Sequence, residues 1–207
     1  MTNFATGDDF PEIREQVTRI CERYPGAFWR QLDADAGYPS DFVDALTKAG
    51  YLAGLIPETY GGAGLPLRAA MVILETIHRT GASASACHAQ MYTMGTLLRH
   101  GSDDQKARYL PQIASGALRL QAFGVTEPTT GSDTTQLKTR AERRGDTYII
   151  NGQKIWTSRA LHSDLMLLLA RTSPLEDCES RSDGLSVFMV DLARPRAPAS
   201  TSGRSRQ

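Results

Sequence analysis

Apolar residues in the first half of the sequence recur every three or four positions, the spacing that places them on one face of an α-helix. The first such stripe predicts an amphipathic helix near the N-terminus. A second helix is bracketed by Pro39 and Ser40 before it and by Gly50 after it, and further helices are predicted over residues 67–79 and 84–99. The first stripe consists of Phe10, Ile13, Val17, Ile20 and Tyr24.

Several residues mark where helices start and stop. Repeated Pro and Gly make residues 55–64 a loop. Ser102 followed by Gln105 predicts a capping box, in which each side chain accepts a hydrogen bond from a backbone N–H at the helix start. Pro111 has no amide hydrogen, so we expect the helix that starts at Ser102 to kink or end near Leu110.

After about residue 116 the apolar period shortens to two, which is typical of β-strands. A turn is expected at Gly145-Asp146. The strongest hairpin signal is Asn151-Gly152, because both residues tolerate the positive φ of a type I′ turn. It predicts a second hairpin in which 148–150 pairs with 154–156. Strands are expected over residues 118–123, 137–143, 148–150, 154–156, 165–170 and 185–190.

The order of these elements, helices first and strands afterwards, predicts an α+β fold rather than alternating α/β. We expect a helical domain over residues 1–116, a β domain over 117–193 and a tail over 194–207. The tail contains no large apolar residue, so burial cannot offset the entropy of ordering it, and we expect it to be disordered. A shift of reading frame near Ala193 would also produce such a tail.

Composition narrows the classes of function. The sequence has 23 Lys and Arg against 23 Asp and Glu, so no net charge favours nucleic acid or an anionic membrane as a partner. The longest apolar run, residues 165–170, is far shorter than the roughly 20 residues that span a bilayer. Three scattered cysteines suit a reducing compartment and predict a cytoplasmic protein. The four histidines lack metal-ligand spacing with the cysteines, so no metal site is expected.

The segment from Val125 to Asp133 carries a dense set of polar groups. Gly131 lets the backbone approach a ligand closely, and neighbouring hydroxyls offer hydrogen bonds to phosphate or carbonyl oxygens. Such a loop suits a dinucleotide, although a plain turn between strands has the same composition. It is not the G-x-G-x-x-G of a strand-to-helix turn, which excludes a Rossmann site. The hydroxyls belong to Thr126, Thr129, Thr130 and Ser132.

The run FGVTEPTTGSD over residues 123–133, followed by KIWTS over 154–158, resembles the two flavin-contacting segments of the acyl-CoA dehydrogenase family. The resemblance covers residues 10–191. It implies an N-terminal helical domain and an antiparallel, β-barrel-like middle domain, which enclose FAD and an acyl-CoA thioester together with a C-terminal four-helix domain. The tail over residues 194–207 begins where the family would continue into further strand and then into the four-helix domain, which has no counterpart in this sequence. The β domain is therefore expected to be an incomplete FAD-binding domain.

The first segment supplies five expected cofactor contacts, each carried over from the resemblance by position. Phe123, Val125 and Thr126 would line the isoalloxazine ring, with Thr126 donating hydrogen bonds to the carbonyl edge of the flavin. Gly131 and Ser132 would bind the pyrophosphate. Ser132 would also meet the CoA portion of the substrate.

The second segment supplies Trp156, Thr157 and Ser158 as expected cofactor contacts. Trp156 would pack against the ring face, and Ser158 would bond near the hydride-accepting nitrogen. The family more often has Trp-Ile-Thr at these positions, and Ser158 keeps the hydroxyl donor of that pattern. A buried aromatic on a strand is the alternative interpretation of Trp156.

The resemblance implies an FAD-dependent enzyme that desaturates an acyl-CoA between its α and β carbons and passes electrons to an electron-transfer flavoprotein. The glutamate that removes the α proton lies in the family's C-terminal domain, so Glu75 and Glu127 are assigned no catalytic role, and a truncated chain with little or no activity is expected. Full-length relatives are expected to be homo-oligomers. The alternatives are a non-catalytic or pseudogene-derived fragment that binds flavin or acyl-CoA, and a flavin oxidase or monooxygenase of the same fold.

Overall fold

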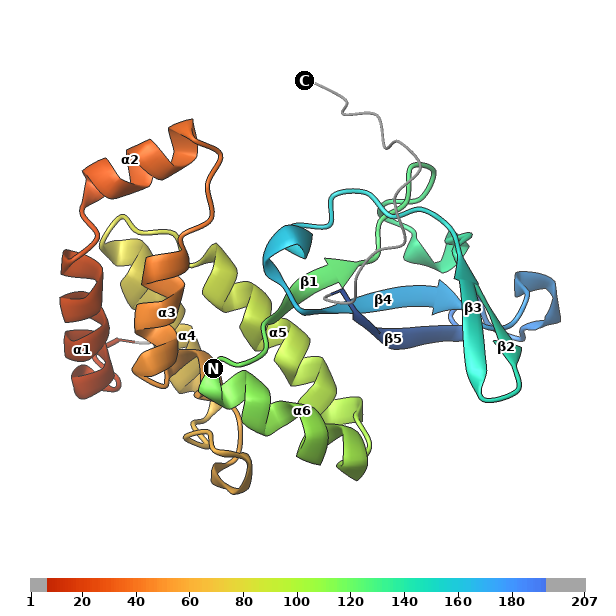
Figure 1. The fold of residues 1–207 in the computed structure, drawn as a ribbon, viewed down its shortest axis with the longest axis horizontal. Helices are drawn as coiled ribbons and strands as arrows, with labels where there is room; N and C mark the ends of the chain where they lie inside the picture. The colour runs from red at the N-terminus through yellow and green to blue at the C-terminus, as the bar shows by residue number, and fades with distance from the viewer. Residues whose placement is uncertain (1–6, 193–207) are drawn as a thin grey trace.

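The computed structural model describes residues 7–192, and within this range the chain forms six α-helices followed by five β-strands. Figure 1 shows the helices gathered on one side of the molecule and the strands on the other. The predicted α+β order is therefore confirmed. The tail predicted over 194–207 lies outside the described residues.

Five of the six described helices lie where the hydrophobic periodicity predicts them. The helices are α1 (Pro11–Glu22), α2 (Gly26–Ala34), α3 (Ser40–Lys48), α4 (Leu67–Arg79), α5 (Ser85–His100) and α6 (Asp103–Ser115). The sequence did not predict α2, which has no buried residue and therefore no buried apolar stripe. Trp29 of α2 packs edge-on against Phe42 of α3, with ring centroids 5.0 Å apart, and this contact joins α2 to the helical core.

The helical half is held together by apolar side chains that α1, α3, α4 and α5 turn toward one another. The stripe predicted for the first helix is confirmed, because Val17 is fully buried and Ile13 and Ile20 pack against the same cluster. Each buried side chain of this size contributes roughly 2 kcal/mol through its removal from water. The cluster includes Val17, Phe42, Leu46, Leu52, Ile73 and Ile77.

No described helix combines the length and apolar character needed to cross a membrane.

The start of α6 agrees with the sequence prediction, and its end does not. Ser102 Oγ accepts from the Gln105 amide at 3.2 Å, and Gln105 Oε1 accepts from the Ser102 amide at 2.9 Å, which confirms the capping box. The expectation that the helix ends near Pro111 is wrong, because α6 continues past it. Leu110 and Ile113 on either side are fully buried, so their packing outweighs the one lost backbone hydrogen bond.

The five strands form one mixed sheet in which β4 occupies the centre. The strands are β1 (Leu120–Gly124), β2 (Arg140–Arg144), β3 (Thr147–Asn151), β4 (Leu165–Arg171) and β5 (Leu185–Asp191). The β2–β3 and β4–β5 pairs are antiparallel, whereas β1–β4 and β2–β4 are parallel. The expected all-antiparallel pairing is thus corrected to a mixed one. Residues 125–164 separate β1 from β4 and are long enough for the crossover that a parallel pair needs.

The chain makes one of the two predicted hairpins. The turn expected at Gly145 is confirmed, and it joins β2 to β3. The hairpin predicted at Asn151-Gly152 is wrong, because Asn151 is a ladder residue of β3 and residues 152–156 belong to no strand. Glycine is required at position 152 for a steric reason instead, because a Cβ there would lie 2.3 Å from Thr139 Oγ1.

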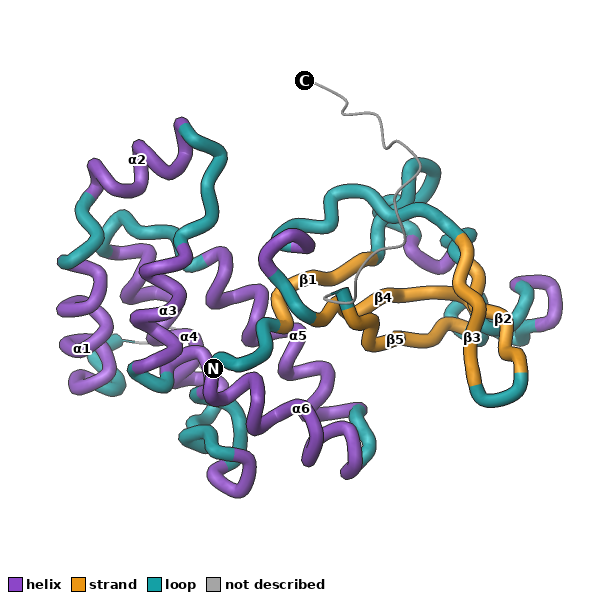
Figure 2. Tube along the Cα trace, in the orientation of Figure 1, coloured by secondary structure: helices purple, strands orange, loops and turns teal. Residues whose placement is uncertain are grey.

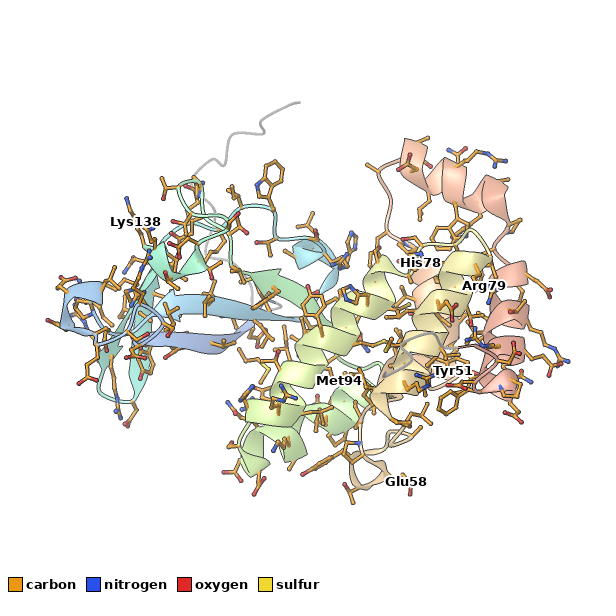
Figure 3. The ribbon with its side chains drawn as sticks, turned by 180° about the vertical axis from the view of Figure 1, so that it is seen from behind. Tyr51, Glu58, His78, Arg79, Met94 and Lys138 are labelled. Atoms are coloured by element: carbon orange, nitrogen blue, oxygen red, sulfur yellow. The ribbon has the colours of Figure 1, made fainter. Side chains whose placement is uncertain are left out.

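The two halves meet where α5 packs against β1, as the tube view in Figure 2 shows. Thr93 Oγ1 on α5 donates to the Leu120 carbonyl at the start of β1, at 2.5 Å. Met94, labelled in Figure 3, belongs with Leu120 and Leu165 to an apolar cluster that spans both halves. The strand that leads into the first predicted flavin segment is therefore fixed on a buried helix.

Candidate functional site

The end of β1 and the segment that precedes η4 (Ala160–His162) border a hollow of about 290 Å³. Five of the eight residues predicted to contact the cofactor line it. The structure therefore brings the two predicted segments to one place, although their sequence positions are separated by the β2–β3 hairpin. Their role as flavin contacts stays a prediction. The five residues are Phe123, Val125, Thr126, Trp156 and Ser158.

The other three predicted contacts lie beside the hollow. Gly131 and Ser132 are exposed in the turn that follows the short bridge between Glu127 and Thr130. Thr157 is half-buried between two lining residues. A Cβ added to Gly131 would meet no atom of the described chain within 4 Å, so the packing of these residues does not explain why glycine stands there.

A buried ion pair, which we call the buried staple, joins the two walls of the hollow. Lys154 Nζ lies 2.9 Å from Glu127 Oε1, and the two side chains are only 8% and 4% exposed. Lys154 Nζ also donates to the Val125 carbonyl at 2.9 Å. Next to the staple, the Ile155 amide donates to the Thr126 carbonyl at 2.9 Å. These bonds fix the distance between the segment after β1 and the segment before η4.

Glu127 is held as an anion at neutral pH. Its carboxylate accepts hydrogen bonds from the backbone amides of Lys138 and Thr139 at 2.6 and 2.8 Å. Burial alone raises the pKa of Glu127, but the hydrogen bonds from Thr139, Lys138 and Lys154 outweigh burial and lower the pKa to about 2. Such a carboxylate is a poor proton acceptor at neutral pH. Glu75, the other carboxylate considered from the sequence, is bound to Arg14 at 2.9 Å in the helical half.

Trp156 and Arg159 adopt left-handed backbone conformations, with φ values of 58° and 62°. This conformation costs a non-glycine residue about 1–2 kcal/mol. Between them the Ser158 amide donates to the Trp156 carbonyl at 2.9 Å, which closes a tight turn. The Trp156 side chain is 84% exposed, so its alternative interpretation as a buried strand aromatic is wrong. Strain at an exposed aromatic is more typical of a functional site than of a packing site.

The lining of the hollow combines aromatic faces with unengaged hydroxyls. The rings of Tyr92 and Phe123 lie 6.0 Å apart at one wall, and the exposed indole of Trp156 stands at another. Within residues 7–192 no hydrogen bond engages the hydroxyl of Thr126 or Ser158. Aromatic faces beside free donors suit a planar ring that carries carbonyl and nitrogen acceptors.

Sequence reasoning missed three residues that line the same hollow. Tyr92 comes from α5, where it fits an ordinary helical pattern and gives no separate signal. Arg159 directly follows the predicted segment and brings a guanidinium to the hollow, so adjacency alone would have suggested it. Ile155 lies inside the KIWTS segment and contributes its backbone to the wall. The ion pair between Glu127 and Lys154 could not be predicted from the sequence either, because 26 residues separate the two and only the fold brings them together.

Comparison with protein families agrees with this fold. Residues 8–117 match the model of the acyl-CoA dehydrogenase N-terminal domain, and residues 122–206 match that of the acyl-CoA dehydrogenase middle domain. The first match covers the six helices, and the second covers the sheet and both segments of the hollow. The chain belongs to the acyl-CoA dehydrogenase family.

Individual relatives and solved structures give the same result. Cyclohex-1-ene-1-carbonyl-CoA dehydrogenase of Geobacter metallireducens is 36% identical over 88% of this chain and 46% of its own length. An acyl-CoA dehydrogenase structure from Geobacillus kaustophilus superposes with a TM-score of 0.78 at 25% identity, over 87% of this chain and 47% of that one. The prolyl acyl carrier protein oxidase AnaB superposes with a TM-score of 0.80 at 26% identity, over 89% and 49%. The chain thus spans about half the length of the relatives it matches.

Proposed function

We propose that this chain forms the flavin-holding part of an FAD-dependent acyl-CoA dehydrogenase, which desaturates an acyl-CoA thioester between its α and β carbons. One observation carries the proposal: Thr126 and Ser158, which both bear hydroxyl groups, line the same hollow as the exposed Trp156. The family membership and the names of the relatives support the same reaction class.

The residues present fit the flavin ring of FAD. Trp156 offers an aromatic face to one side of the ring, while Thr126 and Ser158 offer hydroxyl donors to its heteroatoms. FAD, when bound, supplies the acceptor for the hydride that leaves the β carbon. Gly131 and Ser132 stand in the adjacent exposed turn, where backbone amides can approach a pyrophosphate.

The protein's own contribution at this site is electrostatic and geometric. Donors fixed by the fold would lower the free energy of the negative charge that a bound flavin carries once it is reduced. Thr126 and Ser158 supply the donors, and the guanidinium of Arg159 adds a positive charge to the same lining. The indole of Trp156 would cover the ring and exclude water, which would strengthen these interactions.

Removal of the α proton needs a base, and the lining of the hollow contains no carboxylate. Glu127 is engaged in the buried staple and cannot serve. We propose that the base comes from outside the described residues, in the assembled enzyme. The acyl-CoA substrate, an electron-transfer flavoprotein as acceptor, a cytoplasmic location and a homo-oligomeric assembly are parts of the same proposal.

Flavin absorbance tests the proposal directly. The protein is purified, incubated with FAD and desalted, and the visible spectrum of the retained flavin is recorded before and after anaerobic addition of an acyl-CoA. Retained absorbance supports flavin binding. Bleaching is expected only in the assembled enzyme, since the base is proposed to lie outside the described residues, and there it supports dehydrogenation. A colourless protein that still binds acyl-CoA would favour the non-catalytic alternative.

The likeness to an oxidase favours a second candidate function. An oxidase and a dehydrogenase of this fold share the flavin site and differ in whether the reduced flavin meets oxygen. Stopped-flow reoxidation of the reduced protein in aerated buffer separates them. Fast reoxidation supports an oxidase, whereas slow reoxidation that an electron-transfer flavoprotein accelerates supports the dehydrogenase.

A further inference from the structure

The turn that carries Trp156 and Ser158 is anchored from both sides. On its N-terminal side, the Ile155 amide donates a hydrogen bond to the Thr126 carbonyl, and Lys154 forms the buried staple with Glu127. After it the chain passes through Arg159, which is itself in a left-handed conformation, into η4. The exposed indole contributes little packing of its own, so the strained backbone of the turn depends on an anchor within η4.

That anchor is an aromatic stack between the two halves of the molecule. The ring of His162 in η4 lies parallel to the ring of Tyr38, with centroids 4.3 Å apart and planes inclined by 12°. Tyr38 comes from the loop between α2 and α3, so a residue of the helical half holds the end of a turn in the β half. Within the turn itself, Arg159 Nε donates to the Gln121 carbonyl at 3.4 Å. Directly after η4, the Gln121 amide donates to Ser163 Oγ at 3.3 Å and the Asp164 amide donates to the Arg119 carbonyl at 2.9 Å, so the stack holds η4 while these bonds hold the chain that follows it.

Tyr38 is in turn held by two further contacts, one at its hydroxyl and one at its ring face. Its hydroxyl donates to Gln121 Oε1 at 2.6 Å, and Gln121 Nε2 donates to Gln90 Oε1 at 3.1 Å. Both glutamine side chains are buried, so this chain of bonds is shielded from water. The Arg119 guanidinium lies 5.6 Å from the Tyr38 ring centroid and is ion-paired with Asp44 of α3. The Tyr38 ring therefore has one defined orientation.

We propose that Tyr38 is a positioning residue for the turn over residues 156–159. Its ring fixes η4 through His162, and η4 fixes where Trp156 and Ser158 stand relative to Thr126. Loss of the ring releases the C-terminal anchor, and the two left-handed residues then relax toward ordinary conformations. The effect on the backbone is independent of the ligand, whereas the effect on flavin binding rests on the proposed function.

Hydrogen exchange tests the backbone effect. Tyr38→Leu is compared with Tyr24→Leu, which removes a second tyrosine of the helical half whose hydroxyl donates to the Asp41 carbonyl at 2.8 Å. Exchange over residues 155–163 is expected to speed up about tenfold in Tyr38→Leu, the effect of roughly 1.4 kcal/mol of lost local stability, and to stay at the wild-type rate in Tyr24→Leu. Equal exchange in the two variants would overturn the proposal. If the leucine variants do not fold, His162→Ala removes the other ring of the stack and provides the same comparison, with Leu161→Ala, at the exposed neighbouring residue of η4, as its control.

Titration with FAD tests the functional effect. Tyr38→Leu is expected to raise the Kd for FAD about tenfold and to shift the visible spectrum of the bound flavin, as the loss of one ordered aromatic wall would. Tyr38→Phe is expected to restore most of the affinity, since it keeps the stack. If the wild-type protein binds no FAD, the proposed function fails while the exchange result still decides the role of Tyr38. If the wild type binds FAD and Tyr38→Leu loosens residues 155–163 without changing Kd or spectrum, the turn does not position a flavin contact.

Discussion

Lys154 and Glu127 form an ion pair of 2.9 Å in which both side chains are more than nine-tenths buried. The glutamate comes from the segment after β1 and the lysine from the segment before η4, so the pair joins the two walls of the candidate site, beside the bonds from Lys154 to Val125 and from Ile155 to Thr126. Burying two charges is costly, and the cost is offset here because backbone amides and a carbonyl complete the hydrogen bonding of both groups. The pair therefore defines the geometry of the site more than it adds to overall stability.

Removing one partner of the buried staple is expected to destabilise the protein. Lys154→Met leaves the Glu127 carboxylate buried without its cation, so we expect the free energy of unfolding to fall by about 3–5 kcal/mol. The double variant with Glu127→Gln is expected to lose less than the sum of the two single losses. Urea unfolding measures both. Glu15→Gln, which breaks the exposed pair with Arg19, is the control and should cost less than about 1 kcal/mol.

Acid should weaken the fold through Glu127. Its pKa is lowered from 4.5 to about 2, so the folded state binds its proton less readily than the unfolded state. The stabilisation is fully present above about pH 4.5, is lost as the pH falls toward 2, and amounts to roughly 3 kcal/mol. Unfolding free energies measured between pH 6 and about 3 should show roughly 2 kcal/mol of this loss. In Glu127→Gln the loss over the same range should be smaller, and an equal loss would assign the acid sensitivity to other groups.

Trp156 should matter for flavin binding and not for folding. Its side chain is 84% exposed, so Trp156→Ala is expected to change the free energy of unfolding by less than about 0.5 kcal/mol. The same variant is expected to raise the Kd for FAD about tenfold, because one stacking face is lost. Leu161→Ala is a matched control, since Leu161 is 83% exposed in the adjacent η4 and does not line the hollow. A comparable loss of affinity in both variants would argue against a stacking role.

Two glycines of the site are expected to respond in opposite ways. At Gly131 a Cβ would meet no described atom, so Gly131→Ala should leave stability unchanged within about 0.5 kcal/mol and weaken FAD binding if a pyrophosphate lies against this backbone. At Gly152 a Cβ would lie 2.3 Å from Thr139 Oγ1, so Gly152→Ala should cost about 1–3 kcal/mol. Thermal unfolding and FAD titration of both variants check the contrast. Unchanged FAD affinity in Gly131→Ala would remove this turn from the proposed site.

The sequence predicts well what depends on local periodicity. The bounds of α4 and the capping box at Ser102 are set by neighbouring residues, and both agree with the structure. It predicts poorly what depends on distant packing. Pro111 stays helical because Leu110 and Ile113 are buried against other elements, which no local rule contains.

The same division holds at the site. The two segments could be recognised from their residues, but the fold was needed to place Trp156 and Thr126 at one hollow. Asn151-Gly152 has the composition of a hairpin turn, yet β3 extends through Asn151 to pair with β2. The glycine there is explained by the nearness of Thr139, a contact between residues that the sequence keeps apart.

The segment between Glu127 and Lys154 contains the whole β2–β3 hairpin, and the buried staple joins its two ends. Because its two ends are clamped together, the outer turn at Gly145 can be lengthened, shortened or exchanged with little entropic cost and without altering the spacing at the base. The hairpin is therefore a natural insertion point, at which a tag or a foreign peptide could be grafted while the pocket beneath it keeps its shape.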